Sequence, residues 1–285
     1  METNDKLIDR LIALAFAEDV GDGDATTLST IPAEARGCQQ LIIKEEGILA
    51  GVEMAKRVFD YFDPELKMTV YINDGAHVKP GDVAFEVEGS VRSLLQTERT
   101  MLNIMQRMSG IATTTARYQK QLEGTGARVL DTRKTTPGMR LMEKEAVKIG
   151  GGTNHRIGLF DMILIKDNHV DFAGGIDKAV AAAKAYCKET GKDLKIEVEV
   201  RNTEEIKQAL EAGVDRIMLD NFTPARTREA VDFIRSVNKD VEIESSGGIT
   251  FETLRDYGVC GVDFISVGAL THSVKGLDMS FKAKK

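Results

Sequence analysis

The chain has 285 residues, of which 42% are hydrophobic and 29% charged, the composition of a soluble globular protein with one or two domains. Its formal net charge of -7 argues against sequence-independent nucleic-acid binding, but it does not exclude small anionic substrates, which respond to local potential. The three cysteines lie far apart and predict no disulfide framework or zinc pair, which favours a reducing cytoplasm.

The first segment, "METNDKLIDRLIALAFAEDVGDGD", has apolar residues at helical spacing from Leu7 to Phe16 and predicts an amphipathic helix. It lacks the long apolar stretch and the cleavage site of a signal peptide. No run in the chain approaches the roughly 18 apolar residues of a membrane helix. We therefore expect a cytoplasmic protein without a membrane or nucleic-acid partner.

The residues up to about 109 predict a mostly antiparallel sheet, because short strand-like runs such as "KMTVYIN" and "DVAFEVEG" are separated by turn signals. A helix follows in "SLLQTERTMLNIMQRMSG". Its Met101, Met105 and Met108 recur at helical spacing, which indicates a core or a subunit interface rather than a cofactor site.

From Ala127 onward, six short apolar runs alternate with helical patterns, which predicts a parallel sheet with helical crossovers. This part is shorter than the roughly 250 residues of a complete eight-unit barrel. We expect an α/β protein with an abbreviated or open β/α barrel and an N-terminal α+β sheet domain. The predicted domains are 1–109, joined by the C-terminal tail 271–285, and 110–270, the catalytic barrel.

Polar residues follow every one of these apolar runs. In parallel β/α folds the active site lies at the carboxyl ends of the strands, so a shared location there indicates a site even though each residue alone is unremarkable in a loop. The residues at the six strand ends are Asp131, Arg133, Lys134, Lys166 to His169, Glu199, Arg201, Asp220, Asn221, Ser245 to Gly248, Gly268 and His272.

Two glycine-rich turns, "ESSGGIT" and "VGALTHS", follow the last two strands. Glycine lets backbone N–H groups approach an anion, and a helix N-terminus after the first turn would add positive potential. The alternative is two ordinary turns. Their position in consecutive final units favours a phosphate site, because barrels often bind phosphate there.

In "IEVEV", alternation directs Glu197 and Glu199 into the barrel, and Asp220 ends the neighbouring strand. Buried carboxylates are costly unless they are paired, bind a metal or bind hydroxyls. Mg²⁺ or sugar hydroxyls near a phosphate would suit them. The alternative is an internal salt bridge with Lys166 or Arg133.

The loop "LDTRKTTPGMR" gathers Arg133, Lys134 and Arg140 in an acidic chain, as either a solvated loop or a pocket for an anion. His155, His169 and His272 have no metal-ligand spacing, so a zinc site is not expected. Beside an anion an imidazole can donate hydrogen bonds.

Taken in order, "EDVGDGDATT", "ERTMLNIMQRMSGIAT", "DTRKTTPGMR", "GGGTNHRIGLFDMILIKDNH", "EVEV", "LDN", "SSGG" and "VGALTHS" make the chain resemble the quinolinate phosphoribosyltransferases over nearly its whole length. The resemblance implies transfer of phosphoribosyl from phosphoribosyl pyrophosphate to quinolinate with decarboxylation, giving nicotinate mononucleotide, pyrophosphate and CO₂, with Mg²⁺. Both substrates are polyanions, which accounts for the basic loop.

The resemblance also implies a role for each matching residue. Arg133, His155, Arg156 and Lys166 would hold the quinolinate carboxylates, with Arg99 reaching in from a second subunit of a homo-oligomer that is at least a dimer. Those facing phosphate or pyrophosphate would be Lys134, Ser246, Gly247, Gly268 and His272. Glu199 and Asp220 would meet the ribose hydroxyls and Mg²⁺ and, with Lys134 and Lys166, form the catalytic set.

Two alternatives remain. Lys166 ends a barrel strand as the lysine of a Schiff-base aldolase does. A related barrel phosphoribosyltransferase with another acceptor, or a non-catalytic binder, would keep the phosphate turns. The presence of Arg99, Arg133 and Arg156 together favours quinolinate.

Overall fold

A computed structural model describes residues 4–284, which form two compact units. The first comprises the chain up to Ala116, Thr135–Gly151 and the chain from Leu270 on. The second comprises Arg117–Lys134 and Gly152–Ala269. The predicted boundaries at 109 and 270 stay a prediction, and the contacts group residues 135–151 with the first unit rather than with the barrel.

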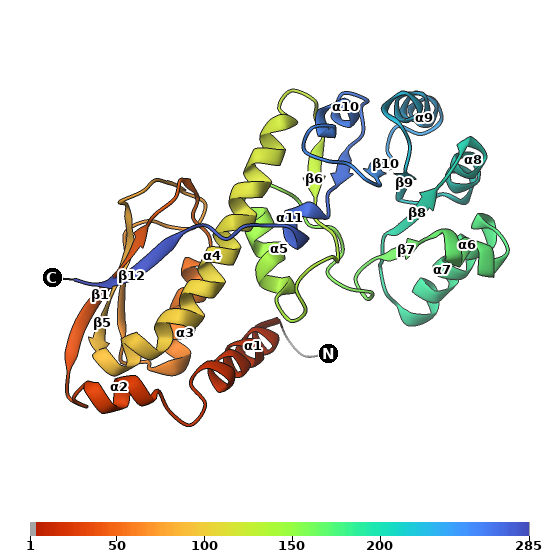
Figure 1. The fold of residues 1–285 in the computed structure, drawn as a ribbon. Helices are drawn as coiled ribbons and strands as arrows, with labels where there is room; N and C mark the ends of the chain where they lie inside the picture. Colours follow the sequence, from red (N-terminus) through yellow and green to blue (C-terminus); the bar gives the residue numbers. More distant parts are fainter. Residues whose placement is uncertain (1–3, 285) are drawn as a thin grey trace. The chain divides into compact units, whose positions relative to one another are not determined.

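The first unit contains an antiparallel four-stranded sheet in the order β12-β1-β5-β3, which confirms the predicted sheet type. A two-stranded ladder, β2 with β4, accompanies it. The strands are β1 (Arg36–Ile43), β2 (Gly47–Ile48), β3 (Lys67–Val70), β4 (His77–Val78), β5 (Val83–Ser90) and β12 (Met279–Ala283). Figure 1 shows β12, from the end of the chain, beside β1, from near its beginning.

Aromatic packing ties the C-terminal strand to this sheet. The rings of Phe59, Phe85 and Phe281 are all buried, and their centroids lie 6.0 to 6.3 Å apart. They come from a helix, a central strand and β12, so three parts of the chain share one apolar cluster. Burying rings of this size contributes a large share of the apolar free energy of a small unit.

Six helices have most or all of their described residues in the first unit. They are α1 (Asn4–Asp19), α2 (Ala25–Thr30), α3 (Val52–Phe62), α4 (Val91–Gln121), α5 (Arg140–Ile149) and α11 (Ala269–His272). The long α4 passes into the second unit at Arg117, and α11 begins in that unit with Ala269. Met101, Met105 and Met108 of α4 are buried, which confirms that this stripe is packing. No helix among residues 4–284 is long and apolar enough to cross a membrane.

The second unit is a six-stranded sheet in the order β6-β11-β10-β9-β8-β7, with every neighbouring pair parallel. Its strands are β6 (Arg128–Leu130), β7 (Ile163–Ile165), β8 (Ile196–Val200), β9 (Arg216–Asp220), β10 (Glu242–Ser246) and β11 (Phe264–Ser266). Within the described residues no ladder joins β6 to β7, so the sheet is open. This confirms the predicted open or abbreviated β/α barrel.

Helical crossovers connect these strands, and α7 to α10 follow one another outside the sheet (Figure 1). They are α6 (Asp167–Ala173), α7 (Ile176–Thr190), α8 (Thr203–Ala212), α9 (Pro224–Val237) and α10 (Leu254–Gly258). All six expected strands are present. Five helices of the described chain, α2, α3, α5, α6 and α11, were not predicted. Arg140 of the basic loop is the first residue of α5.

Close approach of α4 and α5 depends on a glycine. A Cβ placed on Gly150 would collide with the carbonyl oxygen of Ala112 and lie 2.8 Å from Cβ of Thr115. The clash is with backbone and a short side chain of α4, which have little room to move.

We therefore expect Gly150→Ala to lower the free energy of unfolding by about 1–3 kcal/mol, the usual effect of overpacking. Urea and thermal denaturation would measure it. Gly276→Ala is the matched control, because its Cβ would meet Gln106 only at 3.4 Å, an ordinary contact. Equal losses in both variants would contradict the helix-contact explanation.

Candidate active site

Ten of the predicted site residues belong to the second unit, where they follow the carboxyl ends of its strands. They are Arg133, Lys134, His155, Arg156, Lys166, Glu199, Asp220, Ser246, Gly247 and Gly268. The other two belong to the first unit. Arg99 lies exposed on α4, and His272 ends α11 with its Nδ1 2.6 Å from Oγ of Ser273.

The loop that carries His155 and Arg156 is fixed to the edge strand β6. The N–H of Thr153 donates to the Val129 carbonyl at 2.9 Å, and the N–H of Asp131 donates to the Thr153 carbonyl at 3.1 Å. The backbone N–H of His155 then donates to Oδ1 of Asp131 at 2.8 Å. Asp131 is fully buried, so this side-chain acceptor joins the loop to the strand that leads to Arg133.

Arg133 and Arg156 are held close enough for their charges to repel. Burial, followed by the charge of Arg133, lowers the pKa of Arg156 below its usual value. Nη1 of Arg156 donates to the Met162 carbonyl at 3.3 Å, which holds the side chain near the end of the loop. Two guanidinium groups near one another concentrate positive charge, and their planar forks have the geometry that matches carboxylates.

Glu199 and Asp220 form the acidic side of the same sheet, and Lys166 lies beside Glu199. Nζ of Lys166 lies 3.5 Å from Oε2 of Glu199. Burial raises the pKa of Glu199, the nearby charge of Asp220 acts in the same direction, and Lys166 opposes it. Lys166 is half-exposed and ion-paired, unlike a Schiff-base lysine desolvated in an apolar pocket.

These two carboxylates fit Mg²⁺. They are hard oxygen donors at the ends of neighbouring strands, β8 and β9. Mg²⁺ in proteins is commonly held by one or two carboxylates together with substrate phosphates and water. Glu199 and Asp220 would supply the protein's part of that coordination.

The glycine turn after β10 packs closely against Asn221 and adopts a left-handed conformation. Gly247 has φ +97°, and a Cβ there would lie 2.9 Å from the Asn221 nitrogen. Asn221 is itself left-handed, with φ 56°, and its N–H donates to the Ser246 carbonyl at 2.9 Å. The expected contribution of a helix N-terminus needs correction, because α10 begins only at Leu254 and has five residues.

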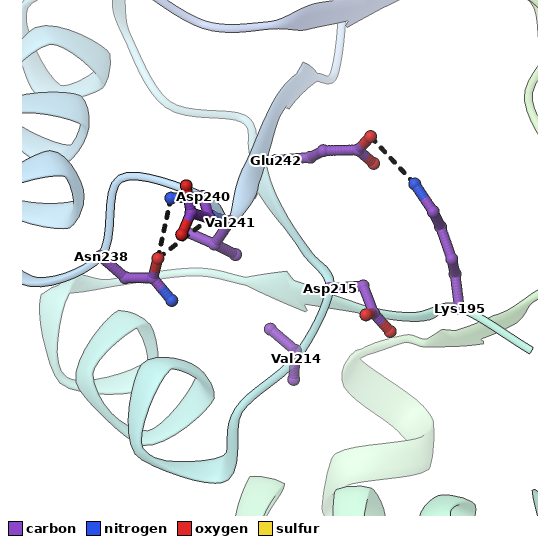
Figure 2. Close-up of a pocket in the computed structure, with 7 residues that line it drawn as sticks. All are labelled: Lys195, Val214, Asp215, Asn238, Asp240, Val241 and Glu242. Atoms are coloured by element: carbon purple, nitrogen blue, oxygen red, sulfur yellow. Dashed lines mark hydrogen bonds and ion pairs between the residues drawn. The ribbon is translucent and has the colours of Figure 1, made fainter.

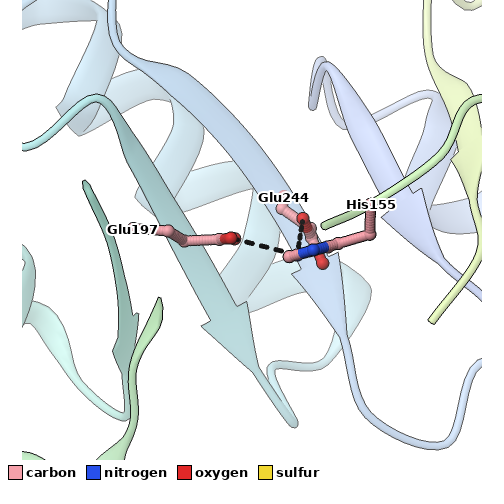
Figure 3. A group of neighbouring side chains, drawn as sticks. All are labelled: His155, Glu197 and Glu244. Atoms are coloured by element: carbon pink, nitrogen blue, oxygen red, sulfur yellow. Dashed lines mark ion pairs between the residues drawn. The ribbon is translucent and has the colours of Figure 1, made fainter. Parts of the chain in front are cut away.

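Below this edge, a charged array lies inside the second unit. Nε2 of His155 lies 3.0 Å from Oε2 of Glu197 and 3.5 Å from Oε2 of Glu244, as Figure 3 shows. Nη1 of Arg216 donates to Oε2 of Glu244 at 3.2 Å. All four side chains are buried. Glu197 therefore points inward as predicted, but its partner is His155, while Lys166 pairs with Glu199.

Strand register brings this array together. Arg216 of β9 pairs in register with Glu197 of β8 on one side and with Glu242 of β10 on the other. Neighbours in register point to the same face of a sheet. Sequence analysis missed Arg216 and Glu244, although the alternation in "EIESS" directs Glu242 and Glu244 to one face just as "IEVEV" does for Glu197 and Glu199.

Each charged group in the array changes the pKa of its neighbours. Burial opposes the imidazolium, whereas Glu197 and Glu244 act to raise the pKa of His155 and favour a proton on Nε2. Burial and the charge of Glu244 raise the pKa of Glu197 to about 7. Burial also opposes the charged form of Glu244, but His155 and Arg216 outweigh it and lower its pKa.

His155, Glu197 and Glu244 also have the atom types and spacing of a metal site, with ligand atoms within 4.8 Å of one another. The two carboxylates already have positively charged or proton-donating partners. His155 lies beside both of them, and Arg216 contacts Glu244. We therefore interpret the group as an ion-pair network. A divalent cation would place excess positive charge beside a buried arginine.

A separate pocket lies at the opposite, amino end of the strands. Its lining includes Lys195, Asp215 and Glu242, which stand just before or at the start of β8, β9 and β10 (Figure 2). Nζ of Lys195 donates to Oε1 of Glu242 at 3.0 Å. The amino end of a β/α sheet usually serves stability, so this pocket is not the candidate site.

Comparison with known proteins agrees with this geometry. The family model "Quinolinate phosphoribosyl transferase, N-terminal domain" matches residues 24–109, and its C-terminal counterpart matches residues 111–282. The Arabidopsis thaliana protein "Nicotinate-nucleotide pyrophosphorylase [carboxylating], chloroplastic" is 45% identical over 285 residues, covering 95% of this chain and 81% of its own.

Two solved structures share the fold throughout. NadC from Streptococcus pyogenes is 39% identical with a TM-score of 0.91, and the match covers all of both chains. The nicotinate-nucleotide pyrophosphorylase from Francisella tularensis is 40% identical with a TM-score of 0.91, covering 99% of this chain and 98% of its own. This chain belongs to the quinolinate phosphoribosyltransferase family.

Proposed function

We propose that this enzyme transfers phosphoribosyl from phosphoribosyl pyrophosphate to quinolinate and decarboxylates the product to nicotinate mononucleotide, a step of NAD biosynthesis. The observation that carries this assignment is that the charge of Arg133 acts on the partly buried Arg156, while Glu199 and Asp220 stand at the carboxyl ends of β8 and β9 in the same unit. One side of the sheet edge is built for carboxylates and the other for a sugar that develops positive charge.

The reaction needs no protein nucleophile. The pyridine nitrogen attacks the anomeric carbon while the bond from that carbon to pyrophosphate breaks. The ring nitrogen then bears positive charge, so the adjacent carboxylate leaves as CO₂ and its carbon takes up a proton. Orientation of two bound anions and stabilisation of developing charge would supply most of the rate.

Named residues take these roles. Arg133, Arg156 and Lys166 would bind the quinolinate carboxylates, and Glu199 with Asp220 would favour positive charge on the ribose. Mg²⁺, when bound at Glu199 and Asp220, would neutralise charge on the leaving pyrophosphate.

Phosphate groups would occupy the glycine turns. Backbone N–H groups at Ser246, Gly247 and Gly268 would hold the 5′-phosphate, because a turn with glycine in the left-handed conformation can direct successive N–H groups toward an anion. Lys134 and His272 would face pyrophosphate. His155, whose ring nitrogens both contact the protein, remains a predicted neighbour of quinolinate.

We also propose a homo-oligomer, at least a dimer, in which Arg99 completes the site of a second subunit. Arg99 lies exposed on α4, as a residue that serves another subunit must. A cytoplasmic location fits the three free thiols of Cys38, Cys187 and Cys260.

The assignment predicts the products of one assay. Quinolinate, phosphoribosyl pyrophosphate and Mg²⁺ should yield nicotinate mononucleotide, CO₂ and pyrophosphate in equal amounts, and a chelator should stop the reaction until Mg²⁺ is restored. Product chromatography and labelled CO₂ release would measure this. Binding of phosphoribosyl pyrophosphate without product would point to another acceptor, and borohydride trapping of substrate on Lys166 would point to an aldolase.

Removing the Arg133 guanidinium should weaken quinolinate recognition. We expect Arg133→Ala to raise the KM for quinolinate by about tenfold to a hundredfold, because charge-assisted hydrogen bonds contribute about 1.5–3 kcal/mol. Arg133→Lys should be intermediate, since it keeps the charge and loses the fork. Arg128→Ala is the control, because Arg128 is exposed and lies at the other end of β6. Steady-state kinetics would measure the KM of each variant. Equal KM values for Arg133→Ala, Arg133→Lys and Arg128→Ala would refute the role of Arg133.

Subunit mixing tests the role of Arg99. Arg99→Ala and Lys166→Ala should each be nearly inactive, whereas a refolded equimolar mixture should recover about a quarter of wild-type activity if a dimer exchanges subunits at random. Heterodimers would then hold one intact site. A mixture as inactive as its parents would show that Arg99 acts within its own subunit or not at all.

A further inference from the structure

Three members of the charged array inside the second unit, Glu197, Glu244 and Arg216, have no role in the reaction as described so far. Glu197, Glu244 and Arg216 lie on β8, β10 and β9, below the residues proposed to meet substrate. Glu197 and Glu244 are completely inaccessible to solvent. Burying two carboxylates costs free energy that apolar side chains of similar volume would not, so stability alone does not account for them.

The array converges on one imidazole. Nε2 of His155 faces both carboxylates, and Nδ1 accepts a hydrogen bond from the backbone N–H of Arg156 at 2.7 Å. An acceptor role at Nδ1 leaves Nε2 as the nitrogen whose proton points toward the carboxylates. This fixes the rotation of the ring from both sides.

The backbone around the ring is held as well. The N–H of His155 donates to the buried Oδ1 of Asp131 at 2.8 Å. The backbone before the Arg156 side chain is therefore held at two points. The N–H of Arg156 is bound by the His155 ring, and the N–H of His155 is bound by Asp131. Any rotation of the ring would release the Arg156 N–H and loosen the base of its side chain.

We propose that Glu197 and Glu244 are positioning residues that lock the His155 ring and, through it, hold the Arg156 guanidinium where it meets a quinolinate carboxylate. This inference rests on the proposed function, because it concerns the same quinolinate site. Arg216 contributes indirectly by holding Glu244. The carboxylates act from inside the sheet, so they set the geometry of the cationic site while remaining out of contact with the substrate.

Glu197→Gln is the most informative variant. It keeps the side-chain shape, and Arg216 retains its contacts with Glu242 and Glu244, so no arginine is left unpaired. We expect the KM for quinolinate to rise about tenfold, with kcat and the KM for phosphoribosyl pyrophosphate within about twofold of wild type. A change in general folding would alter both KM values or the active fraction instead.

Glu242→Gln is the matched control. Glu242 contacts the same Arg216, with its Oε2 2.8 Å from Nη2, but it belongs to the amino end of β10, and its contacts are with Arg216 and Lys195 rather than His155. Its kinetic constants should equal those of wild type. A rise in the quinolinate KM as large as that of Glu197→Gln would overturn the proposal, because the effect would then come from Arg216 and not from the imidazole.

A double-mutant cycle with Arg156→Ala tests the route of the effect. If Glu197 acts through Arg156, Glu197→Gln combined with Arg156→Ala should be no worse than Arg156→Ala alone. Additive losses would overturn the proposal. Should Glu197→Gln fail to fold by circular dichroism, Glu244→Gln enters the same cycle with the same expectation.

Product formation by the wild-type enzyme tests the proposed function separately from the positioning role of Glu197 and Glu244. If the wild type makes no nicotinate mononucleotide, the proposed function fails, and calorimetric binding of quinolinate replaces KM in the same cycle. Weaker quinolinate binding by Glu197→Gln, absent in Glu242→Gln, would still support the positioning role. Unchanged quinolinate binding by a folded Glu197→Gln protein would overturn it.

Discussion

The second unit depends on one constraint: carboxylates that β-strand alternation directs into the sheet interior must be paired there. Glu197 and Glu244 meet this requirement with His155 and Arg216, and register places Arg216 between two glutamate-bearing strands. Without Arg216 or His155, a charge would be buried alone, which is far more destabilising than the pair itself is stabilising. The strands are therefore bound by charge as well as by apolar packing.

The charged groups differ between the amino end, the middle and the carboxyl end of these strands. At the amino end, Lys195 and Glu242 form a partly exposed ion pair beside a pocket. In the middle lies the buried array. At the carboxyl end, Arg133 and Arg156 gather near the β6 edge, while Glu199 and Asp220 lie at β8 and β9. In the proposed function, the arginines near β6 would meet an aromatic dicarboxylate and the carboxylates of β8 and β9 would meet a ribose.

The first unit contributes a second polar network, centred on Arg107 of α4. Its Nε donates to Oε1 of the buried Glu143 at 2.9 Å, and its Nη2 donates to the Thr271 carbonyl at 2.6 Å. Oε2 of Glu143 accepts from the Thr136 N–H at 3.2 Å. One arginine–glutamate pair thus contacts two segments of the chain. One segment follows Lys134 and the other contains the residue before His272. Lys134 and His272 are both proposed to bind phosphate.

The sequence by itself determined the fold class and the six parallel strands. It also predicted a site at the carboxyl edge, because apolar runs followed by polar residues place polar chemistry there whatever the detailed packing. Alternation alone also determined that Glu197 points inward. Only the tertiary structure decided which charges meet. His155 lies 42 residues before Glu197 and 89 before Glu244, and spacing along the chain says nothing about register between strands or about a loop that docks on the edge of β6. The partner of Glu197 is set by that docking, since a buried charge pairs with whatever cation the folded chain brings within reach.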